Sequence, residues 1–493
     1  MTNPDGPTSR FPGLLEIAPG VGYNKPAAAA ISGRKRPSRT ARDTYSQSKG
    51  SAMEARSIRG FHDVLPEDVK RWHHIEEAAK SVFELHGYSE LRMPVLEFTE
   101  IFARSLGSTT DIVEKEMYTF TDRDGSSLTL RPEGTAGVVR SYIENSMWAK
   151  SPVTKLYYTG MMFRHERPQK GRYRGFYQIG AELLGPEEPS SDAELITMIW
   201  KLLERIGITK YLKLELSSLG DDNCRPQYKE KLIAFFTPER DRLCEDCQRR
   251  LETNPLRILD CKVKGCREIA AGAPKMIDNL CADCSRHLGE VRESLDSVGV
   301  PYAINPGIVR GLDYYTRTVF EITTEELGSQ NAVAAGGRYD GLVEELGGPH
   351  TPAVGFAVGM ERLVLLHRTA FPEGFGKEVF IFLAYLGEEA RKKAFSLAFK
   401  LRNNGIPTEV DYGNKSLKSQ LKRADKSGAK YTIIIGEEEL NRGKIVVREM
   451  EGSVQNEFAM NDIDELVNGL IHVENSLKKI DETFINWLKG TFQ

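Results

Sequence analysis

The segment YYTGMMFRHERPQKGRYRGFYQIGAE, residues 157–182, is the most informative part of this sequence. Two runs of aromatic and β-compatible residues, 155–164 and 173–184, flank a polar segment that contains Pro168 and Gly171. This pattern predicts an antiparallel hairpin with a long tip. Positive charge gathers around the tip, at Arg164, His165, Arg167, Lys170, Arg172 and Arg174. Because arginine presents planar donors suited to phosphate, we interpret the hairpin as an anion platform; a solvated charged loop is the alternative.

Length and composition bound the class of protein. A chain of 493 residues suggests about three domains. Hydrophobic residues make up 40% and charged residues 28%, a globular balance, and no apolar run approaches the ~20 residues that span a bilayer. We therefore exclude an integral membrane protein. The 67 basic residues nearly balance the 70 acidic ones, so a nucleic acid would have to bind at local patches.

All seven cysteines lie between Cys224 and Cys284. In a long chain without a secretory segment, this clustering indicates reduced thiols or a metal, and we expect a cytoplasmic protein. The pairs Cys244-x-x-Cys247 and Cys281-x-x-Cys284 have the spacing of zinc ligands, because each pair lets one turn present two thiolates. These four thiols are the candidate zinc site, and buried cysteines without a metal are the alternative.

The segment LTLRPEGT, residues 128–135, predicts part of a binding pocket. It runs from a predicted strand into a turn, and a predicted helix follows at 136–143. Glu133 and Thr135 in this turn could accept the ammonium group of a free amino acid. The alternative is an ordinary helix N-terminus, where such residues are favourable anyway.

Two more segments predict local structure around a ligand. In VRGLDYYTRTVFE, residues 309–321, a strand would point Tyr314 and Tyr315 to opposite faces, so that one lines a pocket and the other braces it. AGGRYDGL, residues 335–342, predicts a glycine-rich turn. A lone glycine-rich loop is weak evidence for phosphate binding, and Gly355 and Gly359 indicate close approach of the backbone.

Four segments resemble the motifs of one family. Arg-His-Glu-Arg, Gly-Arg-Tyr-Arg and Phe-Tyr-Gln follow one another in the predicted hairpin, and this order resembles motif 2 of the class II aminoacyl-tRNA synthetases, specifically of the histidyl-tRNA synthetase family. A predicted helix at 67–86 and strand at 88–97, with Pro94 inside the strand, resemble motif 1, the dimer-forming element. VGFAVGMERLVLL, residues 354–366, resembles motif 3, and the segment 309–321 resembles a signature peculiar to the histidyl family.

The resemblance implies a fold and a domain order. The fold is an α+β class II catalytic domain on an antiparallel sheet, with an inserted mainly helical region and a C-terminal α/β anticodon-binding domain. The predicted ranges are 1–52 for a disordered tail, 53–220 and 301–372 for the catalytic domain, 221–300 for the insertion, 377–475 for the anticodon-binding domain and 476–493 for a C-terminal extension. The tail is rich in Pro, Gly, Ser and Ala, and it is either a targeting peptide or a start-site artefact ahead of Met53.

The pattern after residue 378 supports the last domain independently. Predicted elements alternate as strand 379–384, helix 388–403, strand 408–411, helix 416–426 and strand 431–435. Such alternation indicates a small α/β domain with parallel strands.

The resemblance also implies roles for the motif residues. Histidine and ATP would give histidyl-adenylate and pyrophosphate, and the histidyl group would pass to the terminal ribose of a histidine tRNA. The implied histidine contacts are Glu133, Thr135 and Gln178 at the amino group and Glu182 and Tyr315 at the imidazole, with Tyr314 also in the histidine site. The implied ATP contacts are Arg164 at the α-phosphate, Glu166 and Phe176 at adenine and Arg362 at the γ-phosphate, with Arg310 against the reacting phosphate as a second catalytic arginine. Magnesium is expected with ATP, because the phosphates need countercharge.

Basic residues predict the tRNA contacts. On the predicted helix 416–426, one face carries Lys415, Lys418, Lys422 and Lys426, and the opposite face carries Leu417, Leu421 and Ala424. A lysine stripe suits phosphate contacts along RNA, and a solvated helix surface is the alternative. The candidate tRNA contacts are Lys418 and Lys422 on this helix and Arg167 and Gln169 at the hairpin tip. Motif 1 implies a homodimer.

Two other functions compete with histidine–tRNA ligation. A non-catalytic relative, such as the regulatory paralogue of histidine biosynthesis, would bind histidine but typically lacks an anticodon domain and degrades the catalytic signatures. Another class II synthetase, for threonine or proline, would lack the signature from Arg310 to Tyr315. This sequence has a predicted anticodon-binding domain, and its catalytic signatures, including the one from Arg310 to Tyr315, are present. The resemblance therefore favours the ligase.

Overall fold

The computed structural model describes residues 55–472, except 108, 109, 111, 310, 311, 313, 329, 330, 373–379, 414, 463 and 464. The predicted tail 1–52, the predicted extension 476–493 and Arg310 lie outside the described residues. Within the part of the chain that is described, no helix is both long and apolar enough to cross a membrane.

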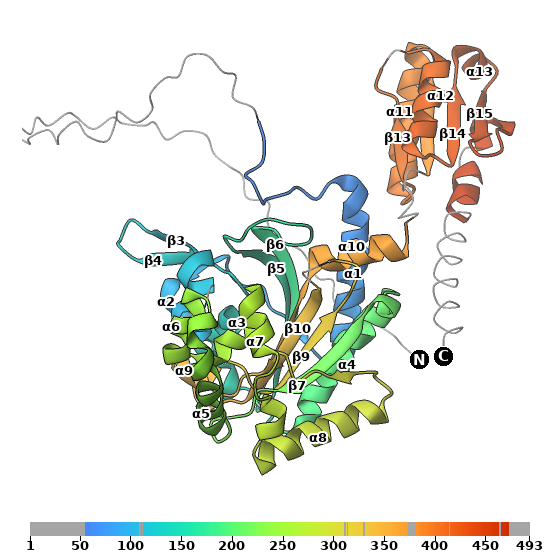
Figure 1. The fold of residues 1–493 in the computed structure, drawn as a ribbon. Coiled ribbons are helices and arrows are strands. Elements are labelled where there is room, and N and C mark those ends of the chain that lie inside the picture. Colours follow the sequence, from blue (N-terminus) through green and yellow to red (C-terminus); the bar gives the residue numbers. More distant parts are fainter. Residues whose placement is uncertain are drawn as a thin grey trace, which may run out of the picture. The chain divides into compact units, whose positions relative to one another are not determined.

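An eight-stranded sheet forms the centre of the catalytic domain (Figure 1). Its order is β1 (Ser89–Glu90), β5 (Thr154–Phe163), β6 (Gly175–Leu184), β11 (Ala353–Gly359), β10 (Ala332–Arg338), β9 (Thr316–Thr323), β7 (Lys213–Ser218) and β8 (Ala303–Ile304). The six inner strands pair antiparallel, and only the two-residue edge strands β1 and β8 pair parallel. The predicted hairpin is confirmed, since β5 and β6 pair antiparallel over their whole length. The mainly antiparallel sheet predicted for a class II catalytic domain is confirmed as well.

Helices cover both faces of this sheet, and each face has its own core. One core joins the sheet to α1 (Pro66–Leu85), α4 (Pro189–Arg205), α8 (Ala282–Ser297) and α10 (Met360–Ala370). The other joins it to α2 (Thr99–Leu106), the π-helical turn Ile112–Glu116, α3 (Thr135–Glu144) and α9 (Leu342–Glu345). The strand period divides β6 between the two sides: Ile179, Ala181 and Leu183 pack in the first core, whereas Gln178 and Glu182 face the second side.

The predicted helices of the catalytic domain are confirmed within a residue or a few. Pro66 starts α1, where its fixed φ suits the first turn, and Glu67 and Asp68 lie favourably at the same end. Trp72 and Phe83 belong to the apolar stripe that buries this helix. Short 3-10 segments at Met147–Ala149 and Thr209–Tyr211 connect other elements.

The single strand predicted at 88–97 is wrong. The structure divides it into β1 and β2 (Leu96–Phe98), which belong to different sheets. β2 pairs with β4 (Ser127–Leu130), which pairs with β3 (Tyr118–Thr121), in a separate three-stranded sheet. Pro94 lies between the two strands and has no N–H for a ladder, so the chain changes sheets there.

The insertion consists of short helices around a small core. It contains α5 (Arg225–Phe236), α6 (Glu245–Thr253), α7 (Lys264–Ala270) and 3-10 segments at Thr237–Arg242, Pro255–Asp260 and Met276–Asn279. The following helix, α8, packs elsewhere: its Leu288, Val291 and Leu295 belong to the core around α4. The helical character predicted for this region is confirmed, while the domain limits remain predictions.

The C-terminal α/β domain has the predicted alternation. Its elements are β12 (Ile381–Tyr385), α11 (Glu388–Asn403), β13 (Thr408–Val410), α12 (Leu417–Ser427), β14 (Tyr431–Ile435), α13 (Glu437–Asn441), β15 (Lys444–Glu449), β16 (Gln455–Ala459), a 3-10 segment at Met460–Asp462 and helical residues 465–472. β12 pairs parallel with β13 and β14, as expected, and β15 and β16 extend the sheet antiparallel. Helix α12 begins at Leu417, so Lys415 precedes the helix rather than belonging to it.

Candidate active site

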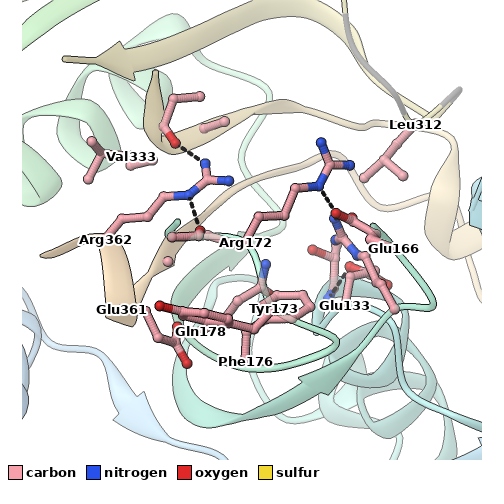
Figure 2. A pocket seen from close by; sticks show the side chains of 18 of the residues that line it. Glu133, Glu166, Arg172, Tyr173, Phe176, Gln178, Leu312, Val333, Glu361 and Arg362 are labelled. Carbon is pink, nitrogen blue, oxygen red and sulfur yellow. Dashed lines mark hydrogen bonds and ion pairs between the residues drawn. The ribbon is translucent and has the colours of Figure 1, made fainter. Parts of the chain in front are cut away.

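A cavity of about 260 Å³ opens beside the β5–β6 hairpin and the start of α10 (Figure 2). Nine of the predicted site residues line it: Glu133, Thr135, Arg164, Glu166, Phe176, Gln178, Tyr314, Tyr315 and Arg362. Glu182 is fully buried and does not line the cavity. Arg167 and Gln169 are exposed and outside its lining, and Lys418 and Lys422 are exposed on α12.

The hairpin tip is tied to α10 by a short turn. Gln169 and Arg172 exchange backbone hydrogen bonds of 3.0 and 2.9 Å across the turn. Gly171 between them has φ +71°, which favours glycine over a residue with a side chain. The carbonyl oxygen of Gly171 accepts a 2.9 Å hydrogen bond from Nε of Arg362. The turn therefore fixes the motif 3 arginine against the motif 2 hairpin.

Three arginines gather at this end of the cavity. Arg362 also donates to the carbonyl of Ala332, Arg172 pairs with Glu166, and Arg164 Nε donates to the carbonyl of Pro132 at 2.8 Å. Burial lowers the pKa of Arg362, and the charges of Arg172 and Arg164 lower it further. An anion bound here would relieve that repulsion. Arg172 was absent from the candidate ligands, although its place in the basic tip was the signal for it.

Phe176 forms the floor under one of these arginines. The guanidinium of Arg164 lies 5.3 Å from the ring centroid, which is a cation–π distance. Because Phe176 also lines the cavity, its ring could stack on a bound aromatic base. Glu166 is buried and engaged with Arg172, so the adenine contact expected of its side chain stays a prediction.

Glu133 combines both alternatives considered for its segment. Its two carboxylate oxygens accept hydrogen bonds from the backbone N–H groups of Thr135 and Ala136, at 2.7 and 2.8 Å, and so satisfy the start of α3. The side chain nevertheless lines the cavity. Burial raises the pKa of Glu133, and the two backbone donors oppose that shift. It can therefore attract an ammonium group while it caps the helix.

Glu182 lies one layer beneath the cavity. Its oxygens accept hydrogen bonds from the hydroxyls of Thr135, at 2.8 Å, and Tyr339, at 2.6 Å. Burial raises its pKa to about 8, against the effect of these two donors. Tyr339 was missed by the sequence analysis, although it stands in the AGGRYDGL segment, because only the fold brings it to Glu182.

Gln178 offers an open acceptor at the same end. Its Oε1 is buried and has no hydrogen-bond partner among the described residues, and the side chain lines the cavity. A buried amide oxygen without a partner costs free energy, so a ligand donor would satisfy it. This agrees with the expected contact to an amino group.

The two tyrosines lie differently from the prediction. Tyr314 and Tyr315 precede β9 rather than lie in a strand, and their ring centroids are 4.6 Å apart. Both line the cavity and both belong to the same apolar core. The expectation that they point to opposite faces is therefore wrong, because the alternation of a strand does not apply before residue 316.

The glycine predictions also need correction. Gly336 and Gly337 lie inside strand β10, so the turn predicted at 335–342 is wrong for its first half, and only Asp340 and Gly341 form a turn. The backbone at Gly355 serves Glu182 rather than phosphate: a Cβ there would lie 1.5 Å from Oε2 of Glu182. Gly359 does line the cavity beside Arg362. Arg338, in the same strand, is fully buried and pairs with Asp192 of α4, which is a structural role.

Glu361 is a further cavity residue that the sequence analysis missed. It precedes Arg362 in the motif 3 segment and lines the cavity. Its carboxylate accepts a 2.9 Å hydrogen bond from the backbone N–H of Tyr177. Burial raises its pKa to about 7. Its position next to Arg362, a predicted ATP contact, was the signal that could have identified it.

The expected zinc site is wrong in its grouping. Cys244 and Cys247 lie with Cys261 and Cys266, whereas Cys281 and Cys284 lie with Cys224 and Asp221. The two Cys-x-x-Cys pairs thus belong to separate clusters. Sequence spacing identifies each pair, but which pair meets which other thiol depends on the path of the chain between them.

An antiparallel sheet with this arginine-lined cavity, followed by a small α/β domain, is the architecture of a class II aminoacyl-tRNA synthetase. Residues 60–363 match the family model described as histidyl-tRNA synthetase, and residues 380–470 match the model of an anticodon binding domain. The chain belongs to the histidyl-tRNA synthetase family.

Known relatives agree over most of their length. The histidine–tRNA ligase of Geobacter sulfurreducens is 53% identical over 407 residues, which are 82% of this chain and 97% of the relative. That of Syntrophotalea carbinolica is 50% identical and covers 84% of this chain and 98% of the relative. The crystal structure of apo S. aureus histidyl-tRNA synthetase is 38% identical, with a TM-score of 0.71, and covers 85% of this chain and 100% of that one.

Proposed function

We propose that this protein activates L-histidine with ATP and transfers the histidyl group to its cognate tRNA. It is a histidine–tRNA ligase by its family and by its similarity to curated ligases. One observation carries the mechanism: a single cavity is lined by three arginines, by the buried carboxylate of Glu133 and by the amide oxygen of Gln178, which has no partner among the described residues, and the buried carboxylate of Glu182 lies beneath it.

Histidine would bind at the carboxylate end. Glu133 and Gln178 would accept hydrogen bonds from its ammonium group, and the hydroxyl of Thr135 would contribute there. The imidazole would reach toward Glu182 beneath the cavity, and Tyr315, which lines the cavity, adds a polar atom. Glu182 suits this role because Thr135 and Tyr339 already hold both of its oxygens in place.

ATP would bind at the arginine end. Arg164 would contact the α-phosphate, Arg362 the γ-phosphate, and Phe176 would stack under adenine, with Glu166 at its edge. Arg172 is near enough to Arg362 to share the phosphate charge. Magnesium bound with ATP would supply countercharge, and Glu361 is an oxygen ligand of the kind it prefers.

The reaction needs no side-chain nucleophile. The carboxylate of histidine attacks the α-phosphorus, the bond to the β-phosphate oxygen breaks, and pyrophosphate leaves. The residues act by holding the two reactants together and by stabilising charge on the phosphate. Arg310 would add a positive charge there; this role rests on the signature that contains it.

The tRNA would meet two basic surfaces. Lys418 and Lys422 are exposed on α12, opposite the side where Ala424 packs, and can contact phosphates. Arg167 and Gln169 are exposed at the hairpin tip, outside the cavity. Because all seven cysteines are free thiols, we place the enzyme in the reducing cytoplasm.

We also propose a homodimer, because the small sheet next to motif 1 has an exposed apolar face. Phe98 of β2 and Phe120 of β3 both stand opposite Leu128 of β4, so the three side chains share one face. Phe98 is 59% exposed and Phe120 46% exposed, whereas Thr129 on the other face is fully buried. A second copy would cover these rings.

The dimer can be tested by sedimentation. Phe98→Asp should convert the protein to a monomer, because the charge would be buried in the interface. Val153→Asp, at an exposed apolar residue outside this face, is the control and should leave the mass unchanged. A wild-type monomer at micromolar concentration would contradict the proposal.

Amino acid-dependent exchange between ATP and pyrophosphate tests the function. Exchange should occur with histidine and not with threonine or proline. Histidine binding without exchange would indicate the non-catalytic relative, and exchange with another amino acid would indicate a different class II synthetase. Charging of a histidine tRNA transcript then tests the second step.

A further inference from the structure

The first cysteine cluster has the dimensions of a metal site. The sulfur atoms of Cys244, Cys247, Cys261 and Cys266 all lie within 4.8 Å of one another, and those of Cys244 and Cys261 are 3.8 Å apart. A tetrahedral zinc ion with Zn–S bonds of about 2.3 Å places its sulfurs ~3.8 Å apart. Disulfide sulfurs would be ~2 Å apart, and all four cysteines are free.

The chain around this cluster presents the sulfurs from separate short elements. Cys247 lies in α6, Cys266 in α7, and Cys261 directly follows the 3-10 segment Pro255–Asp260. The backbone N–H of Cys244 donates to the sulfur of Cys266 at 3.2 Å, which is the type of contact that stabilises a thiolate ligand. Cys247 and Cys266 are fully buried.

The second cluster adds a carboxylate to three thiols. Ligand atoms of Asp221, Cys224, Cys281 and Cys284 also lie within 4.8 Å of one another. The sulfur of Cys224 accepts from the backbone N–H of Cys281 at 3.0 Å, and the sulfur of Cys281 accepts from that of Cys284 at 3.5 Å. Zinc accepts carboxylate oxygen beside thiolates at similar bond lengths.

The insertion has little else to stabilise it. Its core contains Cys224, Cys247, Cys261, Cys266 and Cys284 among 14 buried residues, and its helices are short. A module of this size rarely supplies enough apolar burial on its own, and a structural metal is a common remedy. Five buried thiols without a ligand would be poor substitutes for larger apolar side chains.

We propose that the insertion binds two structural zinc ions, one in the Cys244–Cys247–Cys261–Cys266 cluster and one in the Asp221–Cys224–Cys281–Cys284 cluster. The four-cysteine site holds the short elements of the insertion together. The aspartate site stands where the insertion leaves the catalytic sheet. The presence of the two zinc ions is independent of the proposed reaction, because it concerns metal content and the stability of the insertion; the positioning role of the second site rests on the proposed function.

The aspartate site also lies close to the histidine signature. The backbone of Gly220, next to Asp221, accepts from the N–H of Arg317 at 2.8 Å, and Arg225 donates to the carbonyl of Tyr315. Asp221 itself lies 3.7 Å from the guanidinium of Arg317. Its zinc would therefore hold the segment that positions Tyr315 in the cavity, so these ligands are positioning residues rather than catalytic ones.

Metal analysis and X-ray absorption at the zinc edge test the proposal on the wild-type protein, purified without chelator. We expect about two zinc ions per chain, with an average near 3.5 sulfur and 0.5 oxygen or nitrogen ligands at about 2.3 and 2.0 Å. A metal-free protein, one zinc per chain, or iron in place of zinc would overturn it. This measurement does not depend on the folding of any variant.

Variants assign the two sites separately. Cys261→Ser and Cys224→Ser should each lower the content to about one zinc, and together to about zero. These residues lie outside the two Cys-x-x-Cys pairs, so one site built from those pairs alone would keep its zinc in both variants. Asp221→Ala should weaken zinc retention in the second site, and Asp222→Ala, at an adjacent carboxylate outside the cluster, is the matched control. Equal zinc retention in Asp221→Ala and Asp222→Ala would remove Asp221 as a ligand.

Steady-state kinetics separate the two sites by function. Cys224→Ser should raise the KM for histidine more than the KM for ATP, because the second site is next to the Tyr315 segment. Cys261→Ser should leave this ratio unchanged. Equal effects of both variants on the ratio would contradict the positioning role of the second site.

Discussion

The two ends of the catalytic cavity are opposite in charge and in the way burial acts on them. At the end proposed for histidine, burial raises the pKa of Glu133 and of Glu182, so the carboxylates resist ionisation. At the ATP end, burial and neighbouring arginines lower the pKa of Arg362. Each end is thus relieved by a ligand of opposite charge, an ammonium group or a phosphate. The same fold preorganises both, and the two half-sites should fail independently.

The largest effect is expected at the histidine end. Glu182→Ala removes the buried acceptor that we propose for the imidazole, so discrimination against near-isosteres of histidine should fall by up to about 10⁴ to 10⁵. The ratio of kcat/KM values in pyrophosphate exchange measures this loss. The KM for ATP should change little. Unchanged discrimination would show that Glu182 does not read the imidazole.

Arg362→Ala should affect the opposite end. Removing one preorganised charge donor costs about 10² to 10³ in rate, and here the loss should fall on ATP binding and adenylation. Arg368→Ala, on the same helix but exposed and paired with Asp68, is the matched control and should stay near wild type. Equal losses in both variants would point to damage of α10 instead.

Arg310→Ala sharpens the comparison, because the signature that contains Arg310 implies a contact with the reacting phosphate. We expect a loss of about 10² to 10³ in adenylation, because a positive charge near the α-phosphate is removed. Transfer of histidine from preformed adenylate to tRNA should suffer less. Single-turnover rates of the two half-reactions, measured with the unfolding free energy, test this role. A variant that adenylates at the wild-type rate would contradict it.

The pH dependence of histidine binding should follow the ionisation of Glu182. The carboxyl of Glu182, with a pKa of about 8, accepts an imidazole N–H best when ionised, so affinity falls as pH drops below that value. Between pH 8 and pH 7 the Kd for histidine should rise about fivefold from this group alone. Glu182→Gln removes the ionisation, and its Kd should be flat in that range. Calorimetric titration with histidine alone provides the measurement.

The smallest effect is expected from the lysines of α12, and replacing them should change neither end of the catalytic cavity. Lys418→Ala with Lys422→Ala should weaken tRNA binding and reduce the salt slope by about one unit per lost phosphate contact. Pyrophosphate exchange needs no tRNA and should stay at the wild-type rate. An unchanged salt slope would show that the stripe is only a solvated helix surface.

Local patterns in the sequence were sufficient for the elements and most of the cavity lining. The strand alternation around the basic tip predicted the β5–β6 hairpin, and the helical pattern at 67–86 predicted α1. The alternation after residue 378 predicted the parallel part of the C-terminal sheet. These features depend on the spacing of apolar and polar residues that are only a few positions apart, and this spacing favours a helix or a strand locally.

Long-range packing decided the rest. Tyr339 reaches Glu182 from another strand, and Gly355 leaves the space that Glu182 occupies. Tyr314 and Tyr315 lie together because the strand begins after them, and the cysteine pairs separate because each pair meets partners from elsewhere in the chain. Sequence spacing fixes which side chains can act together within one turn or strand. Which distant side chains they meet is set by how the elements pack, and that depends on the whole core at once.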